Sequence, residues 1–249
     1  MSVIELPSAK SLLIEMRVNG EYLATGTAFI TNGISGPLLI TNRHNVTGRD
    51  QHTEKALSKT LGLPNEILIN HHSKKRLGTW TSKLEPLYDF HGQPLWKEHP
   101  TLGAKADFIA LPLWHTINVE FYTYDMKNVG EDILLLPADT ISVIGFPFGI
   151  TAGGNLPIWA TGFIASEPTI DYNGLPIQII DCRSRQGQSG SPVVAYRSGG
   201  MIAMEDGSTV GRHGAISKFV GIYSGRINAE SDLGMVWKAK AILELVNSC

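Results

Sequence analysis

The chain has 249 residues, of which 43% are hydrophobic and 18% are charged, and its formal net charge is −2. This length and composition suit one or two packed domains of the soluble globular type, and no apolar run is long enough to span a bilayer. The most basic short run, at residues 74–76, is typical of a solvated turn, so neither nucleic acid nor a membrane is an expected partner.

The cysteine content indicates a reduced environment. Cys182 and Cys249 are too few for the disulfide framework that many secreted proteins carry. The first seven residues also lack a basic segment followed by an apolar core, which a secretion signal would have. We therefore expect a cytoplasmic protein, in which Cys182 is a small buried apolar residue rather than a nucleophile.

The predicted elements are mostly short strands. In the first half, alternating or apolar segments between Gly- and Asn-containing turns predict strands at residues 12–18, 21–31, 37–41, 66–71, 77–84 and 107–113. In the second half, strands are predicted at residues 140–144, 158–166, 177–181, 192–195 and 219–223, and a strand from residue 233 leads into a helix over 238–246. These elements predict an all-β fold of two packed six-stranded antiparallel β-barrels with a C-terminal helix.

An aromatic and polar segment at residues 118–129 is expected to link the two barrels. The predicted domains are therefore residues 1–125 for the N-terminal barrel and 126–249 for the C-terminal barrel.

The most informative segment is Arg185–Ser191, which reads RQGQSGS and precedes Pro192 and an apolar run. Gly187 and Gly190 flank Ser189 and allow the tight backbone turn that exposes a hydroxyl and aims amide N–H groups at one point. A serine hydroxyl is a weak nucleophile near neutral pH and needs an adjacent base. The segment therefore predicts a nucleophile if a base and a carboxylate lie nearby in the fold.

A candidate base and a candidate carboxylate both occur upstream, and each lies at one end of a predicted strand. His44 follows the strand at 37–41, and its ordinary pKa of about 6.5 lets it take and return a proton. Asp107 begins the apolar strand at 107–113 and could orient the imidazole. Asp89 and Asp125 lie within plausible reach along the chain and stay open as alternatives.

Five segments carry these residues and their surroundings: GTAFI at Gly26–Ile30, LLITNRHNV at Leu38–Val46, ADFIAL at Ala106–Leu111, VIGFPFG at Val143–Gly149, and the stretch Asp181–Pro192. Together, and in this order, they resemble the trypsin-like serine proteases, most closely the bacterial HtrA-type peptidase domain. The resemblance implies a chymotrypsin-like fold and a serine endopeptidase that needs no metal or other cofactor. It implies that Ser189 attacks to form an acyl-enzyme, that His44 is the general base and then the acid, and that Asp107 orients His44. The amides of Gly187 and Ser189 would form the oxyanion hole.

The resemblance also implies where a protein or peptide substrate binds. The residues just before Ser189 and the segment Ile222–Arg226, which contains Ser224 and Gly225, would line the primary pocket. Arg183 would lie at its base and Arg226 on its wall. Two guanidinium groups there would favour cleavage after Asp or Glu. The alternative is that Arg183 points away or pairs with Asp181, and that Arg226 merely narrows the pocket.

Two other readings of the same residues fit the sequence less well. The order Ser189, Asp206, His213 would suit a different hydrolase fold, but its nucleophile turn needs a glycine two places after the serine, where this chain has Ser191. The adjacent pair at residues 71–72 would point to opposite faces of a strand, so a shared metal ion is not expected.

The leading alternative function is a catalytically silent or latent trypsin-like domain that binds peptides or serves as a scaffold. A dedicated protein partner or activator would fit either reading. Gln188 has no charge to offer a newly cut N-terminus, so activation by that kind of cleavage is not expected.

Overall fold

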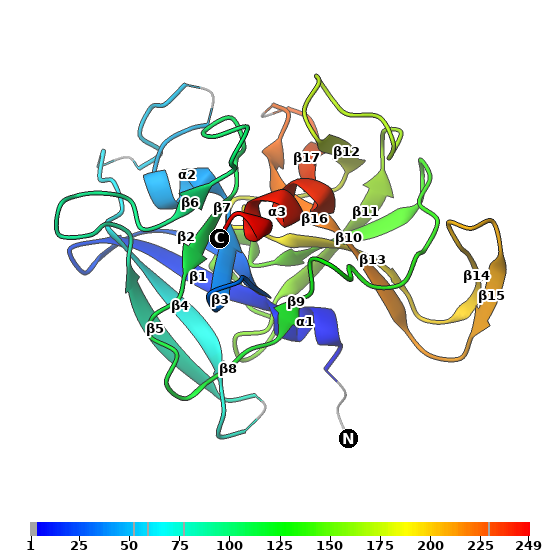
Figure 1. The fold of residues 1–249 in the computed structure, drawn as a ribbon, viewed down its shortest axis with the longest axis horizontal. Coiled ribbons are helices and arrows are strands. Elements are labelled where there is room, and N and C mark those ends of the chain that lie inside the picture. Colours follow the sequence, from blue (N-terminus) through cyan, green and yellow to red (C-terminus); the bar gives the residue numbers. More distant parts are fainter. Residues whose placement is uncertain (1–3, 52, 59, 77, 229) are drawn as a thin grey trace.

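The structure is a computed structural model that describes residues 4–51, 53–58, 60–76, 78–228 and 230–249. Its N-terminal half forms one sheet with the strand order β5-β4-β1-β2-β3-β7-β6, to which β8 adds on β4 and β9 on β2 (Figure 1). The elements are α1 (Leu6–Lys10), β1 (Ser11–Val18), β2 (Glu21–Asn32), β3 (Pro37–Thr41), α2 (Arg43–Thr47), β4 (Glu66–Ser73), β5 (Trp80–Pro86), β6 (Lys97–Glu98), β7 (Ile109–Pro112), β8 (Val119–Glu120) and β9 (Thr123–Tyr124).

The C-terminal half contains a closed barrel in which β10, β11, β12, β17, β16 and β13 follow one another. A separate two-stranded hairpin, β14–β15, projects from the side of this barrel (Figure 1). The elements are β10 (Thr140–Gly145), η1 (Pro147–Gly149), β11 (Ile158–Ile164), β12 (Ile177–Asp181), β13 (Pro192–Arg197), β14 (Gly200–Ala203), β15 (Thr209–Arg212), β16 (Ile216–Arg226), β17 (Leu233–Lys238) and α3 (Ala239–Asn247).

The predicted all-β class and C-terminal helix are confirmed, and the second half has the predicted barrel of six strands. In the described part of the first half, six strands of at least four residues match the predicted number, and the two-residue strands β6, β8 and β9 extend the sheet. The predicted strand at 77–84 begins only at Trp80, and Leu77 lies outside the described residues. None of the helices in the described ranges is long and apolar enough to cross a membrane.

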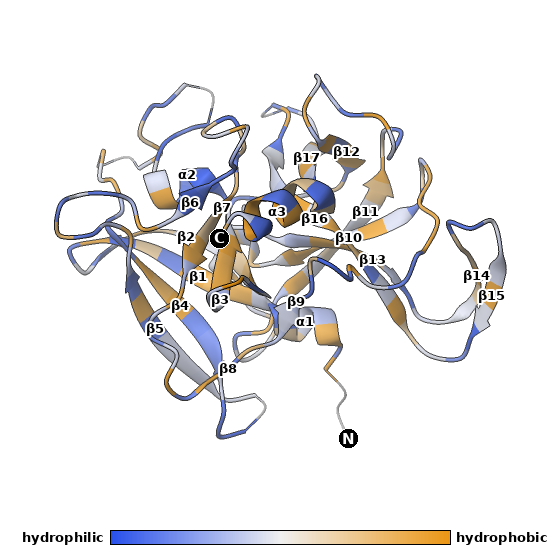
Figure 2. Cartoon of the chain, viewed as in Figure 1, coloured by the Kyte–Doolittle hydropathy of each residue, from blue (hydrophilic) through white to orange (hydrophobic). Residues whose placement is uncertain are grey.

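The two halves pack through apolar side chains that come from both sheets. Phe29 of β2 meets Phe219 of β16 with ring centroids 5.3 Å apart, and Phe108 meets Trp237 of β17 at 5.4 Å. Figure 2 shows hydrophobic residues concentrated on the strands and hydrophilic residues on many of the connecting loops. Helix α3 buries one face in the same core through Ala241, Ile242, Leu245 and Val246, the spacing of an amphipathic helix.

Candidate active site

His44 is fixed at the end of β3, where the chain turns from Thr41 into helix α2. Its Nδ1 lies 2.7 Å from Oδ2 of Asp107, and its backbone N–H donates to Oδ1 of the same carboxylate at 3.0 Å. These two contacts hold the ring and the carboxylate in one orientation. Because an ionised carboxylate only accepts hydrogen bonds, the Nδ1 position carries the proton, and Nε2 of a neutral His44 is left as the acceptor.

Asp107 is only 2% exposed, and its carbonyl and both of its carboxylate oxygens accept hydrogen bonds. Ser224 Oγ donates to Oδ2 at 2.6 Å, and the Asn42 side-chain amide donates to the Asp107 carbonyl at 2.6 Å. A buried carboxylate is tolerated when it is hydrogen-bonded in this way. Ser224, which was predicted to bind substrate, thus also contacts Asp107 directly.

The two alternative carboxylates make local turns instead. Asp89 accepts hydrogen bonds from the backbone N–H groups of His91 and Gln93, and Asp125 accepts from those of Lys127 and Asn128. The structure therefore brings Asp107, and neither alternative, to His44.

The pKa of His44 lies above its ordinary value because of opposing effects. Burial lowers it, but the negative charge of Asp107, the hydrogen bond to Asp107 and the charge of Asp50 together outweigh burial. The imidazole is thus more basic than a free histidine, which suits a group that has to accept a proton from a hydroxyl.

Ser189 lies in the turn between β12 and β13, and backbone contacts dock this turn onto the other half of the molecule. The Thr27 N–H donates to the Ser189 carbonyl at 2.9 Å, and Thr27 Oγ1 donates to the Gly187 carbonyl at 2.9 Å. The Asn45 side-chain amide adds a donor to the Ser189 carbonyl at 3.2 Å. Within the turn, the buried Gln188 side chain accepts the Arg185 N–H at 2.7 Å through Oε1.

The peptide unit between Gln186 and Gly187 has its direction set by a neighbouring turn. The Phe148 N–H donates to the Gln186 carbonyl at 2.6 Å. In a trans peptide the N–H points opposite to the carbonyl, so the Gly187 N–H points away from Phe148. Gly187 has a φ of 93°, and a Cβ there would lie 2.4 Å from the Phe146 carbonyl, which leaves room only for glycine. In the described chain neither the Gly187 amide nor the Ser189 amide donates a hydrogen bond.

One cleft of about 780 Å³ contains the candidate catalytic groups. His44, Asp107, Gly187 and Ser189 all line it, and the remaining lining comes from both halves of the molecule. The described wall residues include Tyr22, Leu23, Thr25, Asn45, Asp50, Leu57 and Lys105 from the first half, and Tyr172, Leu175, Ile177, Gln186, Ser224, Gly225, Arg226, Met235 and Trp237 from the second.

The structure separates the two predicted specificity arginines. Arg226 lines the cleft together with Ser224 and Gly225. Arg183 is exposed and lies outside the cleft lining, so it is not at the base of a pocket. The segment that leads to Ser189 turns its next residue, Ser184, inward and thereby points Arg183 to solvent.

The sequence analysis missed Asn45 and Thr27, which hold the nucleophile turn. Asn45 Nδ2 donates both to Thr41 Oγ1 at 2.9 Å and to the Ser189 carbonyl. The only signal in the sequence is an amide side chain directly after His44, on a helix turn that follows a buried strand. Its hydrogen-bond partners come from segments that are distant in the chain, so the sequence does not indicate them.

Other singled-out groups lie outside the cleft lining. Cys182 is buried, donates its S–H to the Ala160 carbonyl at 3.3 Å, and has a pKa that burial, with nearby Asp181 and Asp232, raises to about 11. Asp206 accepts the Ser208 N–H in the β14–β15 hairpin, and His213 is exposed.

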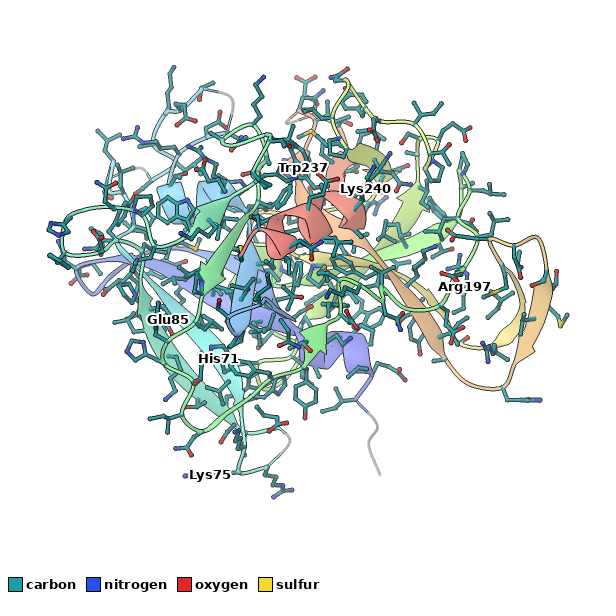
Figure 3. All side chains as sticks on the ribbon, in the orientation of Figure 1. His71, Lys75, Glu85, Arg197, Trp237 and Lys240 are labelled. Atoms are coloured by element: carbon teal, nitrogen blue, oxygen red, sulfur yellow. The ribbon has the colours of Figure 1, made fainter. Side chains whose placement is uncertain are left out.

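The adjacent histidines on β4 are both buried. Burial, together with His72 and Lys83, lowers the pKa of His71 to about 4, and His72 Nε2 lies 2.9 Å from the Ala9 carbonyl. Within the described ranges no group of three or more His, Cys, Asp or Glu is placed to hold a metal ion. Figure 3 shows His71 on the sheet, whereas the side chain of Lys75 extends away from the tip of the β4–β5 turn.

The comparisons with known proteins show the fold. The thermostable serine protease AL20 from an extremophilic microorganism is 10% identical, with 98% of each chain covered and a TM-score of 0.54. The active form of the Rv3671c protease from M. tuberculosis is 14% identical, with 96% of this chain and 80% of that one covered and a TM-score of 0.51. The chain has a chymotrypsin-like fold.

The serine endoprotease from Yersinia pestis is 13% identical, with a TM-score of 0.50; the match covers 95% of this chain and 61% of that one. No protein-family model and no curated protein sequence matches the chain. At these identities the likeness establishes the fold that the chain shares with trypsin-like serine proteases.

The raised pKa of His44 generates a prediction about pH. A protonated His44 cannot accept the Ser189 proton, so the rate of labelling by a serine-directed fluorophosphonate should fall as pH drops through a midpoint above 6.5. Asp50→Asn removes one charge that raises this pKa, so the midpoint should move to lower pH. Asn at this position can still accept the Thr53 N–H and hydroxyl, which keeps the turn intact. A midpoint that rises in Asp50→Asn would contradict this account.

The turn at Phe148 generates a second prediction. Phe148 has a φ of 56° and a ψ of 20°, a left-handed conformation that proline cannot adopt. Phe148→Pro also removes the N–H that holds the Gln186 carbonyl, so it should misalign the Gly187 amide. We expect kcat to fall about 10²- to 10³-fold with little change in KM, the loss typical of one oxyanion donor.

Phe148→Gly is the matched control, because glycine keeps the N–H and accepts the left-handed conformation. It should retain the wild-type kcat. Steady-state kinetics on a cleaved peptide, with circular dichroism to confirm folding, would test the pair, and a fully active proline variant would rule out this role for the turn.

Proposed function

We propose that the protein is a serine endopeptidase that cleaves peptide bonds through an acyl-enzyme intermediate. The observation that carries the proposal is that Ser189, His44 and Asp107 line one cleft, with His44 Nδ1 2.7 Å from the Asp107 carboxylate. A pure binding module has no need for this combination of a buried carboxylate, an oriented imidazole and a serine at a glycine-flanked turn. Residues of both halves line the cleft, so an extended segment of a protein substrate can lie between the halves.

In the proposed reaction Ser189 Oγ attacks the carbonyl carbon of the substrate while Nε2 of His44 takes the hydroxyl proton. The negative charge that forms on the carbonyl oxygen is stabilised by the amides of Gly187 and Ser189. The C–N bond then breaks, and the amine leaves with the proton that His44 returns to it. Water attacks the acyl-enzyme by the same route, with His44 again as base, and releases the carboxylic acid and the free serine.

The first test is covalent labelling of the folded protein with a fluorophosphonate. We expect labelling of the wild type, no labelling of Ser189→Ala, and a loss of about 10⁶-fold in kcat in that variant. Ser191→Ala is the matched control, because Ser191 is a buried serine only two residues away in the same turn. Folded wild type that is not labelled would support the silent or latent alternative, and labelling that survives in Ser189→Ala would exclude Ser189 as the nucleophile.

We further propose that the enzyme favours an acidic residue before the scissile bond and that Arg226 recognises it. Arg226 lines the cleft beside Ser224 and Gly225, whereas Arg183 does not. A guanidinium pairs well with a carboxylate, and a charge-assisted hydrogen bond contributes about 1.5–3 kcal/mol.

Arg226→Gln should therefore lower kcat/KM for cleavage after Asp or Glu about tenfold or more. Arg183→Gln removes the same charge outside the cleft and should leave that preference unchanged. Digestion of a peptide library by the wild type and by both variants measures this. A wild-type preference for Lys or Arg at that position, or a stronger effect of Arg183→Gln, would disprove the assignment.

A further inference from the structure

Tyr223 stands directly beside the candidate nucleophile. It precedes Ser224 on β16, and Ser224 is anchored to the Asp107 carboxylate. Its backbone pairs with the nucleophile turn: the Gly190 N–H donates to the Tyr223 carbonyl at 3.0 Å, and the Tyr223 N–H donates to the Ser191 carbonyl at 2.9 Å. The position of Tyr223 relative to Ser189 is therefore fixed by the backbone on both sides.

The Tyr223 side chain lies in the buried core of the C-terminal barrel, where it spans the space between β17 and the segment that leads to the nucleophile turn. Its hydroxyl is hydrogen-bonded to Oγ of Ser184, on the segment that leads to the nucleophile turn. Its ring packs on the backbone of Gly234 in β17, where a Cβ would lie only 2.6 Å from a ring carbon. Tyr223 is 2% exposed and Ser184 is fully buried, so the space they span is filled.

The cleft lining includes Ser189, Gly187 and the run 224–226 of β16, whereas neither Tyr223 nor Ser184 belongs to it. The ring and hydroxyl of Tyr223 instead fill the space between Gly234 and Ser184, which we call the floor, so a substrate side chain cannot extend there. The floor is also uncharged, since burial raises the pKa of Tyr223 to about 12.

We propose that Tyr223, braced by Ser184, sets a size limit on the substrate residue that precedes the scissile bond. The residues admitted are those with short side chains, such as Ala, Ser, Thr, Val and Asp, and the residues rejected are Phe, Tyr, Leu, Lys and Arg. The inference rests on the proposed endopeptidase function and names the substrate class of the same site. An extended substrate would lie along β16 from Ser224 to Arg226, with this side chain directed toward the floor.

The size limit and the charge preference act through different residues. Arg226 lies in the lining of the cleft, whereas Tyr223 is buried and does not belong to that lining. A substrate aspartate is short enough for its carboxylate to reach Arg226 without entering the floor. The two constraints together therefore favour Asp over the longer Glu.

The test uses diphenyl phosphonates whose side chain copies that of Ala, Val, Leu or Phe, and it measures the second-order rate of inactivation. A fluorophosphonate without such a side chain reports separately whether the nucleophile is active. In the wild type we expect the Ala and Val compounds to react about tenfold or more faster than the Leu and Phe compounds, the discrimination that a few methylene groups produce in a packed site.

Two variants separate the bulk of the ring from its hydroxyl. Tyr223→Val opens the floor and should bring the Phe compound to the rate of the Ala compound or above it. Tyr223→Phe loses the bond to Ser184 but keeps the ring, so it should keep the preference for short side chains.

The outcomes distinguish the size limit from the proposed function. Wild type that reacts with the fluorophosphonate but prefers the Phe or Leu compound overturns the size limit and leaves the serine chemistry standing. Wild type that reacts with none of the reagents overturns the proposed function itself. If Tyr223→Val does not fold, the wild-type ranking together with that of Tyr223→Phe still decides the proposal, because a ranking lost in Tyr223→Phe would assign discrimination to the hydroxyl instead of the ring.

Discussion

The geometry of the cleft depends on one buried residue of β2, Thr27. Its N–H and Oγ1 hold the carbonyls of Ser189 and Gly187, its carbonyl accepts from Thr41 Oγ1 at 2.8 Å, and its Oγ1 accepts the Phe146 N–H at 3.2 Å. Three segments, which are the nucleophile turn, the end of β3 and the turn at Phe146, therefore meet at this one residue of β2. Since the candidate base and nucleophile come from different sheets, this junction sets the distance between them. A misplacement of about 1 Å at such a junction can cost about a hundredfold in rate.

Such a polar junction is stable only because apolar packing surrounds it. The rings of Phe29 and Phe219, and those of Phe108 and Trp237, join the two halves and exclude water from the space around the junction. In a dry environment each hydrogen bond is stronger, but an unmade one is costlier. The hydrophobic contacts thus hold the halves together, and the hydrogen bonds of Thr27 determine how they are aligned.

The sequence predicts those features that depend on local pattern. Strand alternation places the β10–β13, β16 and β17 segments close to where the structure has them, and His44 was recognisable because it follows an apolar strand. The β14–β15 hairpin was missed because residues 200–212 are short and largely polar, without a clear alternation. The outward direction of Arg183 was not predictable either, because it follows from the inward turn of Ser184 toward Tyr223, a partner 39 positions along the chain.

The amides of Gly187 and Ser189, which donate no hydrogen bond within the described residues, bear directly on the proposed reaction. Most buried backbone N–H groups in proteins are paired, and leaving one without a partner costs free energy. Here the Gly187 amide is directed by a Phe148 turn that is itself in a left-handed conformation. The packing of the barrel compensates for the free energy of the unpartnered amide and of the left-handed Phe148, and it does so before a substrate binds. In the proposed reaction, an oxyanion that forms in the transition state would gain these donors without reorganisation of the protein, so the interaction would stabilise the transition state more than the bound ground state.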